Sequence, residues 1–373
     1  MLHVRRAVAC CGALTVALFS FASLSVNGAA SAADPAVVPN AVAYLSESPP
    51  QIAGTTPASG SGAWDPDPNA QFVTTEAVLA IAEAGQSDSS WSTAEAFAAV
   101  DGTKNTDGQS PLAFLDLVAA DATTPGRAAK YVVLVAEPLG LDTTALAATI
   151  GDPAPNGSFG DDLHFTDTLF AALAKDLLDG SVPASTVSYI ESKQQAAGSW
   201  AYNADTTSAT DPDIDTTGLA LQALIAGGVA QNDPAVQHAL AWLASQQNAD
   251  GTWSFFGVPS AESTSRAVLA VTAAGFDPNS RCWRDAVYRA GVGQPFVGAD
   301  DALDSLAQSD GSISGPNVFS PAYATGQAVQ GLERSWLPVA RATDVACLAP
   351  TPPPVAPTNP VAVPLAVAPH FTG

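Results

Sequence analysis

The 373-residue sequence predicts an all-α protein, an (α/α)6 barrel in which about six helix pairs close into a ring. Three observations predict this fold. Two central segments repeat closely, the second helix of each repeat is apolar on nearly all sides, and capping residues mark helix ends. An Ala-rich helix that is apolar all round is buried on most sides. We therefore expect buried inner helices surrounded by amphipathic outer ones.

The two closest repeats lie in the middle of the chain. One runs from Tyr189 to Trp200 and the other from Trp242 to Trp253. In both, an aromatic and an aliphatic residue precede Gln, and Gly-x-Trp follows at the same spacing. A polar loop and a second apolar helix come next. These second helices are expected over residues 215–224 and 262–271.

Weaker copies of this unit flank the central pair. Their first helices are expected near Tyr44-Leu45 and over residues 112–120, 143–150 and 302–308. Their second helices are expected over residues 75–84, 127–137, 165–178 and 323–332. Together with the two central units they make about six helix pairs, which close more naturally into a ring than into an open solenoid with exposed ends.

Capping residues agree with these helix bounds. Side chains that can accept hydrogen bonds from first-turn N–H groups begin three of the inner helices: Asp215 with Thr216, Glu262 with Ser263, and Thr74 with Thr75. Glycines that suit a left-handed C-terminal cap follow the same helices: Gly85, Gly227-Gly228 and Gly275. Under this interpretation Asp215 is a capping residue.

The two ends of the chain have different compositions from the repeats. Arg5 and Arg6, an apolar stretch to Val26 and the small residues 30–32 predict a signal peptide over residues 1–32. We expect the toroid over residues 33–349 and a Pro-rich disordered tail over residues 350–373. No later stretch is long enough to span a bilayer, so we expect a secreted, extracellular protein, free or associated with the cell wall.

The charge and the cysteines limit the partners. The formal net charge is −23, which argues against nucleic acid and against an anionic membrane surface. It is consistent with a soluble monomer. Two of the four cysteines lie in the predicted signal peptide, and the remaining pair, Cys282 and Cys347, predicts a disulfide in a secreted protein.

The repeat resembles a known superfamily. The pattern aromatic-Leu-x3-Gln-x3-Gly-x-Trp is similar to the QW motif of the terpenoid-cyclase and prenyltransferase-repeat proteins, which include the squalene cyclases. Residues 242–253 fit it in full, and residues 189–200 fit it with Ile for Leu. The resemblance covers about residues 38–336 and implies an (α/α)6 barrel whose Gln links a helix end to the neighbouring Trp. The α-domain of secreted cobalamin carriers is a more distant likeness.

One stretch also resembles a catalytic motif. Residues 211–217, Asp-Pro-Asp-Ile-Asp-Thr-Thr, are similar to the Asp-x-Asp-Asp motif of class II terpene cyclases. By this resemblance Asp215 would donate a proton to an alkene or epoxide, and Asp213 would support it. Such an acid must be kept protonated by burial and by neighbouring carboxylates. The match departs at Thr216, where the family has Asp. Class II enzymes also usually carry a second helical barrel, for which this chain has no length.

Other site chemistries find less support. A carbocation needs an aromatic cage, whereas the inner helices are mostly Ala, Leu and Val, which favours a filled or narrow core. A zinc site of the prenyltransferase kind needs Asp, Cys and His. The candidate ligands have no Cys among them, and we interpret them as a solvated acidic loop: Asp161, Asp162, His164 and Asp167. Calcium at Asp211, Asp213 and Asp215 lacks a recognisable loop pattern. We expect no metal and no cofactor.

These observations lead to a primary hypothesis and two alternatives. The primary hypothesis is a secreted, non-catalytic toroid that binds a small molecule or a partner at one rim. The rim residues would be Asp211, Asp213, Asp215, Tyr202, Phe255, Phe256 and Glu262. One alternative is an isoprenoid (squalene or terpene) cyclase that acts by protonation, with Asp213 and Asp215 as its catalytic residues. The other is a structural repeat protein of the cell surface.

Overall fold

The computed structural model describes residues 34–47, 70–87, 90–104, 110–160, 164–207, 212–316 and 320–336. All of them belong to one compact unit. The predicted signal peptide and the Pro-rich tail lie outside these residues, so the expected domain bounds stay predictions. None of the helices within the described ranges is long and apolar enough to cross a membrane.

Helices dominate the unit, as the sequence predicts. The inner helices are α2 (Ala70–Ala84), α5 (Pro125–Tyr131), α8 (Phe165–Asp179), α10 (Ile214–Ala226), α12 (Ala261–Ala273) and α15 (Pro321–Glu333). α5 continues through a π-helical turn, η1 (Val132–Ala136), into α6 (Glu137–Leu139). The outer helices are α1 (Val37–Glu47), α3 (Thr93–Gly102), α4 (Leu112–Asp121), α7 (Thr144–Ile150), α9 (Ala184–Ser192), α11 (Pro234–Gln246), α13 (Arg281–Val287) and α14 (Ala299–Asp304).

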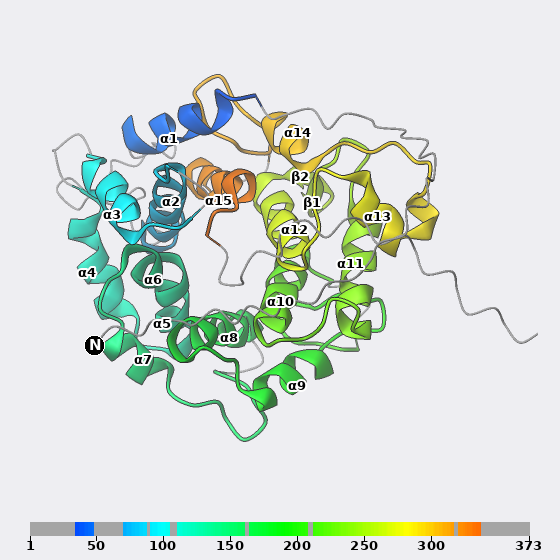
Figure 1. Ribbon diagram of the computed structural model, residues 1–373, viewed down its shortest axis with the longest axis horizontal. Helices are drawn as coiled ribbons and strands as arrows, with labels where there is room; N and C mark the ends of the chain where they lie inside the picture. The colour runs from blue at the N-terminus through cyan, green and yellow to red at the C-terminus, as the bar shows by residue number, and fades with distance from the viewer. Residues whose placement is uncertain are drawn as a thin grey trace, which may run out of the picture. The chain divides into compact units, whose positions relative to one another are not determined.

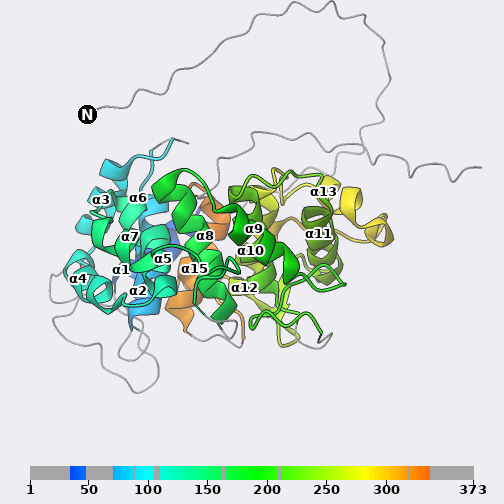
Figure 2. The ribbon, with the colours of Figure 1, turned by 90° about the horizontal axis from the view of Figure 1, so that it is seen from below.

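The inner helices close into a ring. α2 packs against η1, α5 against α8, α8 against α10, α10 against α12, and α12 against α15, which returns to α2 (Figure 1). Figures 1 and 2 agree in placing α8 between α5 and α10. A small antiparallel hairpin, β1 (Trp253–Phe255) and β2 (Val258–Ser260), leads into α12. The ring confirms the predicted α/α toroid, while the number of six pairs stays a prediction.

The inner helices share a register that the sequence comparison did not detect. In α8, α10, α12 and α15 a Thr near the N-terminal end accepts a hydrogen bond from the backbone N–H of the aromatic or aliphatic residue in the preceding Gly-x-x turn. The pairs are Phe159 with Thr168 at 2.9 Å, Trp200 with Thr217 at 3.0 Å, Trp253 with Thr264 at 2.9 Å, and Ile313 with Thr325 at 3.0 Å. Each Thr therefore fixes the rotation of its helix against the ring.

The Gln and Trp side chains of the two central repeats connect outer elements. The indole N–H of Trp200 donates to the Ile190 carbonyl at 2.8 Å, near the end of α9. The Gln194 amide donates to the carbonyls of Gly198 and Ala235, both at 2.9 Å. Gln194 thus joins the Gly-x-Trp turn to the start of α11, the next outer helix.

All three expected N-terminal caps are wrong, and Thr74 and Thr75 lie inside α2, which begins at Ala70. The N-cap of α10 is Asp213, whose side chain accepts the Asp215 N–H at 3.1 Å, and the N-cap of α12 is Ser260. Asp215 and Glu262 therefore lie inside the first turns of their helices rather than capping them. Because α10 begins earlier than expected, Asp215 falls on the helix face that lines a cavity, whereas Glu262 is buried beside Ser260.

Candidate active site

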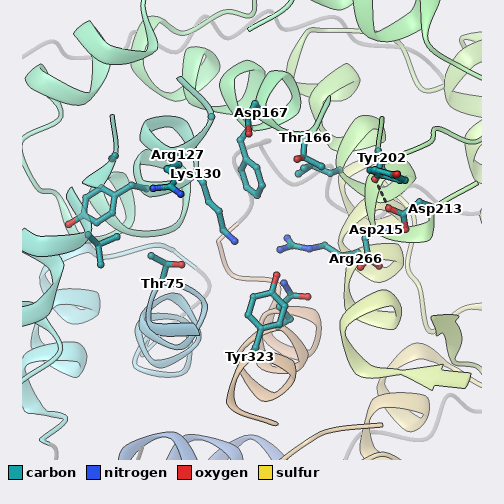
Figure 3. A pocket seen from close by; sticks show the side chains of 18 residues that line it. Thr75, Arg127, Lys130, Thr166, Asp167, Tyr202, Asp213, Asp215, Arg266 and Tyr323 are labelled. Atoms are coloured by element: carbon teal, nitrogen blue, oxygen red, sulfur yellow. Dashed lines mark hydrogen bonds between the residues drawn. The ribbon is translucent and has the colours of Figure 1, made fainter. Parts of the chain in front are cut away.

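A cavity of about 310 Å³ lies among the inner helices (Figure 3). This volume is at the lower end of the range of small-molecule sites. Its aromatic lining residues are Tyr131, Phe170, Tyr202 and Tyr323. The expectation of a filled or narrow core without aromatic walls is therefore wrong, because aromatic residues scattered over several helices meet at one place in the ring.

The shared register explains which side chains reach this cavity. Residues four apart on a helix project from the same face. Residues two before and two after the register Thr line the cavity in these helices: Thr166 and Phe170 in α8, Asp215 and Leu219 in α10, Arg266 in α12, and Tyr323 and Gln327 in α15. The repeat thus places unlike residues at equivalent points of one wall.

Asp213 is held in place by the first turn of α10. Its Oδ1 accepts the Asp215 N–H at 3.1 Å, and its Oδ2 accepts the Thr216 hydroxyl at 2.6 Å. Its own N–H donates to the Trp200 carbonyl at 3.1 Å. Thr216, which breaks the likeness to the catalytic motif, therefore serves to fix the Asp213 carboxylate beside Asp215.

Asp215 combines access to the cavity with a desolvated carboxyl group. The residue lines the cavity, but its Oδ1 atom is buried and has no hydrogen-bond partner among the described residues. The Ser263 hydroxyl lies near but outside hydrogen-bonding geometry. Burial, followed by the negative charges of Asp213 and Glu262, raises the pKa of Asp215 to about 7, against the opposing effects of Ser263 and Arg266. About half of these groups then carry a proton at neutral pH.

A buried ionic cluster lies across the ring, and we call Glu76, Lys130, Arg266 and Gln330 the Glu76 cluster. Glu76 is fully buried in α2, and its Oε1 lies 3.1 Å from both Lys130 Nζ and Arg266 Nη2. Its Oε2 accepts the Gln330 amide at 2.9 Å. Burial acts to raise the pKa of Glu76, but the charges of Lys130 and Arg266 outweigh it and hold this pKa at about 2.

Lys130 also connects the cluster to the aromatic wall. Its Nζ lies 5.7 Å from the ring centroids of both Phe170 and Tyr323, a distance at which a cation is attracted to an aromatic face. Sequence reasoning missed this cluster. A signal was present, because Glu76, Lys130 and Arg266 are charged residues in helices that were expected to be buried, where an unpaired charge would be costly.

The structure separates the predicted rim residues into two groups. Asp213, Asp215 and Tyr202 line the cavity, whereas Glu262 is buried and accepts the Ser260 hydroxyl at 2.8 Å. Phe255 and Phe256 lie at the hairpin, 44% and 89% exposed, and do not line the cavity. The seven residues therefore do not form one rim site.

The remaining predictions concern the disulfide and the acidic residues expected in loops. Asp211, Asp161, Asp162 and Cys347 lie outside the described residues, so the Cys282–Cys347 disulfide stays a prediction. Asp167, expected in a solvated loop, instead lines the cavity from α8. Within the described part of the chain, no three His, Cys, Asp or Glu side chains gather where they could hold a metal ion.

Comparison with known proteins gives a family match over part of the chain. The model of the squalene-hopene cyclase C-terminal domain matches residues 166–288. This range holds both full repeats and the Asp213–Asp215 stretch. No match was found among curated protein sequences.

Solved structures give a match over most of the chain. The type II terpene cyclase MstE from Scytonema, in a variant bound to its substrate geranylgeranyl dihydroxybenzoate, is 15% identical with a TM-score of 0.52. The match covers 82% of this chain and 97% of the cyclase. A second variant of MstE, bound to its product merosterolic acid A, is 15% identical with a TM-score of 0.51, over 80% of this chain and 96% of that one. This likeness establishes the squalene cyclase-like α/α toroid fold.

The comparisons also correct the primary hypothesis. The interpretation as a non-catalytic toroid is contradicted, because the similar structures are type II terpene cyclases with substrate or product bound. The length of the chain does not exclude a cyclase either. A cyclase that this chain matches over 97% of its length needs no second barrel beyond the part that is shared.

Proposed function

We propose that this chain, which has the squalene cyclase-like α/α toroid fold, is a type II terpene cyclase that starts the cyclisation of an isoprenoid by protonation. One observation carries the proposal. Asp215 has a pKa raised to about 7 and a buried carboxylate oxygen, Oδ1, without a hydrogen-bond partner among the described residues, and it lines a cavity with aromatic walls. A carboxyl group in water is ionised at neutral pH and could not act as this acid.

The chemistry begins with a proton transfer from Asp215. The O–H bond of the acid breaks, and the π electrons of a substrate double bond form a new C–H bond, which leaves the neighbouring carbon as a cation. Further double bonds then attack this cation and form the rings. The sequence ends when a C–H proton is lost or water adds and then loses a proton, and Asp215 regains its proton from solvent. On an epoxide, the first proton goes to oxygen instead.

The cavity wall supplies what these steps need. The ring faces of Phe170 and Tyr323 already attract one cation, the Lys130 ammonium, and aromatic faces stabilise a carbocation in the same way. The negative charge of Asp213 beside Asp215 favours the protonated form of the acid. The positive Arg266 is near enough to stabilise the Asp215 carboxylate that forms when the proton leaves.

Two earlier predictions accompany this proposal. We propose that the protein is secreted after removal of residues 1–32 and that Cys282 and Cys347 form a disulfide in the mature chain. Both rest on the sequence alone.

The test is turnover in heavy water. The purified protein is incubated with squalene, geranylgeranyl diphosphate and a geranylgeranyl-substituted aromatic acid in D2O, and products are identified by mass spectrometry. We expect a cyclised product carrying one deuterium delivered by the acid. Asp215→Asn should lower the rate by about a hundredfold to ten-thousandfold, since it removes the general acid.

A matched control separates loss of the acid from the general effect of an Asp→Asn change at the start of a helix. Asp233 caps α11 as Asp213 caps α10, but it lies away from the cavity. Asn is as good a cap as Asp, so Asp233→Asn should keep full activity. A cyclised product that forms equally fast in Asp215→Asn, or that carries no deuterium, would contradict the proposed role of Asp215.

A further inference from the structure

Arg266 lies between two carboxyl groups that belong to different helices. On one side is Glu76 of α2, whose Oε1 lies 3.1 Å from Arg266 Nη2. On the other is Asp215 of α10, the proposed acid, whose Oδ1 has no hydrogen-bond partner among the described residues. The guanidinium thus pairs with the Glu76 carboxylate and makes no hydrogen bond to Asp215 Oδ1.

The backbone of Arg266 lies close to α10, the helix that carries Asp215. α10 and α12 approach so closely that a Cβ on Gly218 would lie 2.6 Å from the Arg266 carbonyl oxygen. The Arg266 side chain therefore starts beside α10. In Figure 3 its guanidinium nevertheless extends across the cavity toward Lys130 and Tyr323, and away from Asp215. The partner that it meets there is the fully buried Glu76.

We propose that Glu76 is a positioning residue, which holds the Arg266 guanidinium away from Asp215 and thereby keeps the Asp215 carboxyl available as an acid. This inference rests on the proposed function for its biological meaning, although the arrangement itself can be tested without substrate. Glu76 does not line the cavity, so it is not expected to touch the reacting atoms.

The electrostatic reason is the competition of the two carboxylates for one cation. An unshared guanidinium within a few ångströms lowers a carboxyl pKa by about 1 to 3 units. Asp215 is faced by Asp213 before α10, by Glu262, Ser263 and Arg266 of α12, and by Tyr323 of α15, with Lys130 of α5 across the cavity. Of these groups, Arg266 carries the positive charge that lowers the pKa of Asp215. The position of its guanidinium therefore sets how far this pKa is lowered.

Glu76 also neutralises part of the charge of the cluster. Lys130 shares the same carboxylate oxygen, and the Gln330 amide bonds to Oε2 at 2.9 Å and to the Glu76 carbonyl at 3.2 Å. Without the carboxylate, two buried cations would face the cavity with no counterion from α2. Of these two cations, Arg266 is the one that acts on Asp215, so its release favours the ionised form of Asp215.

The experiment follows the titration of Asp215 directly. The full chain is labelled with 13C at the Asp carboxyl carbon, and the Asp215 signal is assigned by its loss in Asp215→Asn. Glu76→Gln should move the Asp215 titration to lower pH by about one unit or more. Arg266→Gln should move it to higher pH. The double variant Glu76→Gln with Arg266→Gln should return the titration to the wild-type value or above, because Glu76 acts through Arg266.

Two further variants separate positioning from simple packing. Gln330→Leu removes a hydrogen bond to Glu76 without changing any charge, so it should lower thermal stability but leave the Asp215 titration in place. Glu76→Asp keeps a carboxylate and should give a smaller shift than Glu76→Gln. It also keeps the test available if Glu76→Gln does not fold.

The outcomes are distinct. An unchanged Asp215 titration in a folded Glu76 variant overturns the inference, and so does an equal downward shift in the double variant. If the titration moves as expected but no isoprenoid is cyclised, the positioning role stands and the proposed function fails. If turnover occurs, the pH at which activity is lost should fall in Glu76→Gln by the same interval as the titration.

Discussion

Asp213 and Asp215 lie two positions apart but have different roles, one as a helix cap and the other as a desolvated acid. Asp213 has an extended backbone and uses both carboxylate oxygens to accept hydrogen bonds from the first turn of α10. Asp215 follows inside the helix, where burial and the charge of Asp213 favour its neutral form. The difference depends on where α10 begins, which moves the cap to Asp213 and turns Asp215 inward.

The raised pKa of Asp215 predicts a pH-dependent cost in stability. Its pKa is about 7 in the folded chain and near 3.8 in the unfolded chain. The free energy of unfolding is therefore highest below pH 3.8, and it falls as pH rises from 3.8 through 7. Asp215→Asn cannot ionise. It should therefore unfold at a higher temperature than wild type at pH 8, and this difference should shrink toward pH 4.

Thermal unfolding followed by circular dichroism across this pH range checks the prediction. Asp233→Asn, which alters a cap away from the cavity, should show no comparable dependence. An Asp215→Asn variant that is less stable than wild type at pH 8 would mean that the ionised carboxylate is well solvated, contrary to the site described here.

At the scale of elements, the register Thr residues tie each inner helix to the turn before it. The backbone N–H of Trp200 and Trp253 is buried and donates to Thr217 and Thr264. Thr217→Val or Thr264→Val would leave such an N–H without a partner, at a cost of about 1 to 3 kcal/mol. We expect lower denaturation midpoints in urea with an unchanged slope.

A third Thr provides the matched control. Thr272 in α12 donates only to the Val268 carbonyl four residues back, an acceptor that the helix already satisfies. Thr272→Val should therefore change the midpoint far less than Thr264→Val in the same helix. Equal effects of the two substitutions would show that the loss reflects the Val side chain rather than the register bond.

The π-helical turn η1 is an element that the periodicity did not indicate. It begins two residues after Lys130, between α5 and α6. The carbonyl of Val133 within it accepts the indole N–H of Trp336 at 2.9 Å, and the Trp336 N–H donates to Glu83 at 2.8 Å. Residues after α15 thus help to hold the wall that carries Lys130, a contact that no local pattern encodes.

At the scale of the whole molecule, ring closure depends on a close approach of the first and last inner helices. A Cβ on Gly326 of α15 would lie 3.0 Å from the backbone carbon of Glu76 and 3.1 Å from the Ala77 nitrogen. Backbone atoms cannot move aside as a flexible side chain can. Gly326→Ala should therefore separate α15 from α2, lower the melting temperature and disturb the Glu76 cluster.

Gly102 is the control for this substitution. It ends α3, and a Cβ there would meet nothing within 4 Å. Gly102→Ala should be neutral or stabilise by up to about 1 kcal/mol through the unfolded chain. If Gly326→Ala melts at or above the wild-type temperature, the ring is not closed through this contact.

The predicted disulfide is a second property of the whole chain. Cys282 lies in the first turn of α13, and Cys347 lies beyond the described residues. In secreted protein both thiols should resist alkylation until reduced, as measured by intact mass. Reduction, or Cys347→Ser, should lower the free energy of unfolding by about 4 kcal/mol on the chain-entropy model. Alkylation of both residues without reductant would contradict the pairing.

The toroid, the central repeats and the Asp213–Asp215 pair could be predicted from the amino-acid sequence. Helical periodicity, caps and repeats depend on residues a few positions apart, so they can be recognised without a structure. The departure from the motif at Thr216 also favoured the non-catalytic hypothesis, which the likeness to type II terpene cyclases contradicts. Acidity follows from the surroundings of a carboxyl group and not from the completeness of a motif.

Only the tertiary structure decided what those residues can do. The bond between Arg266 and Glu76 joins positions 190 residues apart, and Lys130 reaches the same carboxylate from a third helix. The cavity, the burial of Asp215 and the direction of the Arg266 guanidinium all arise from how the inner helices pack. Desolvation and charge pairing act through space, and their strength is therefore set only once the ring has closed.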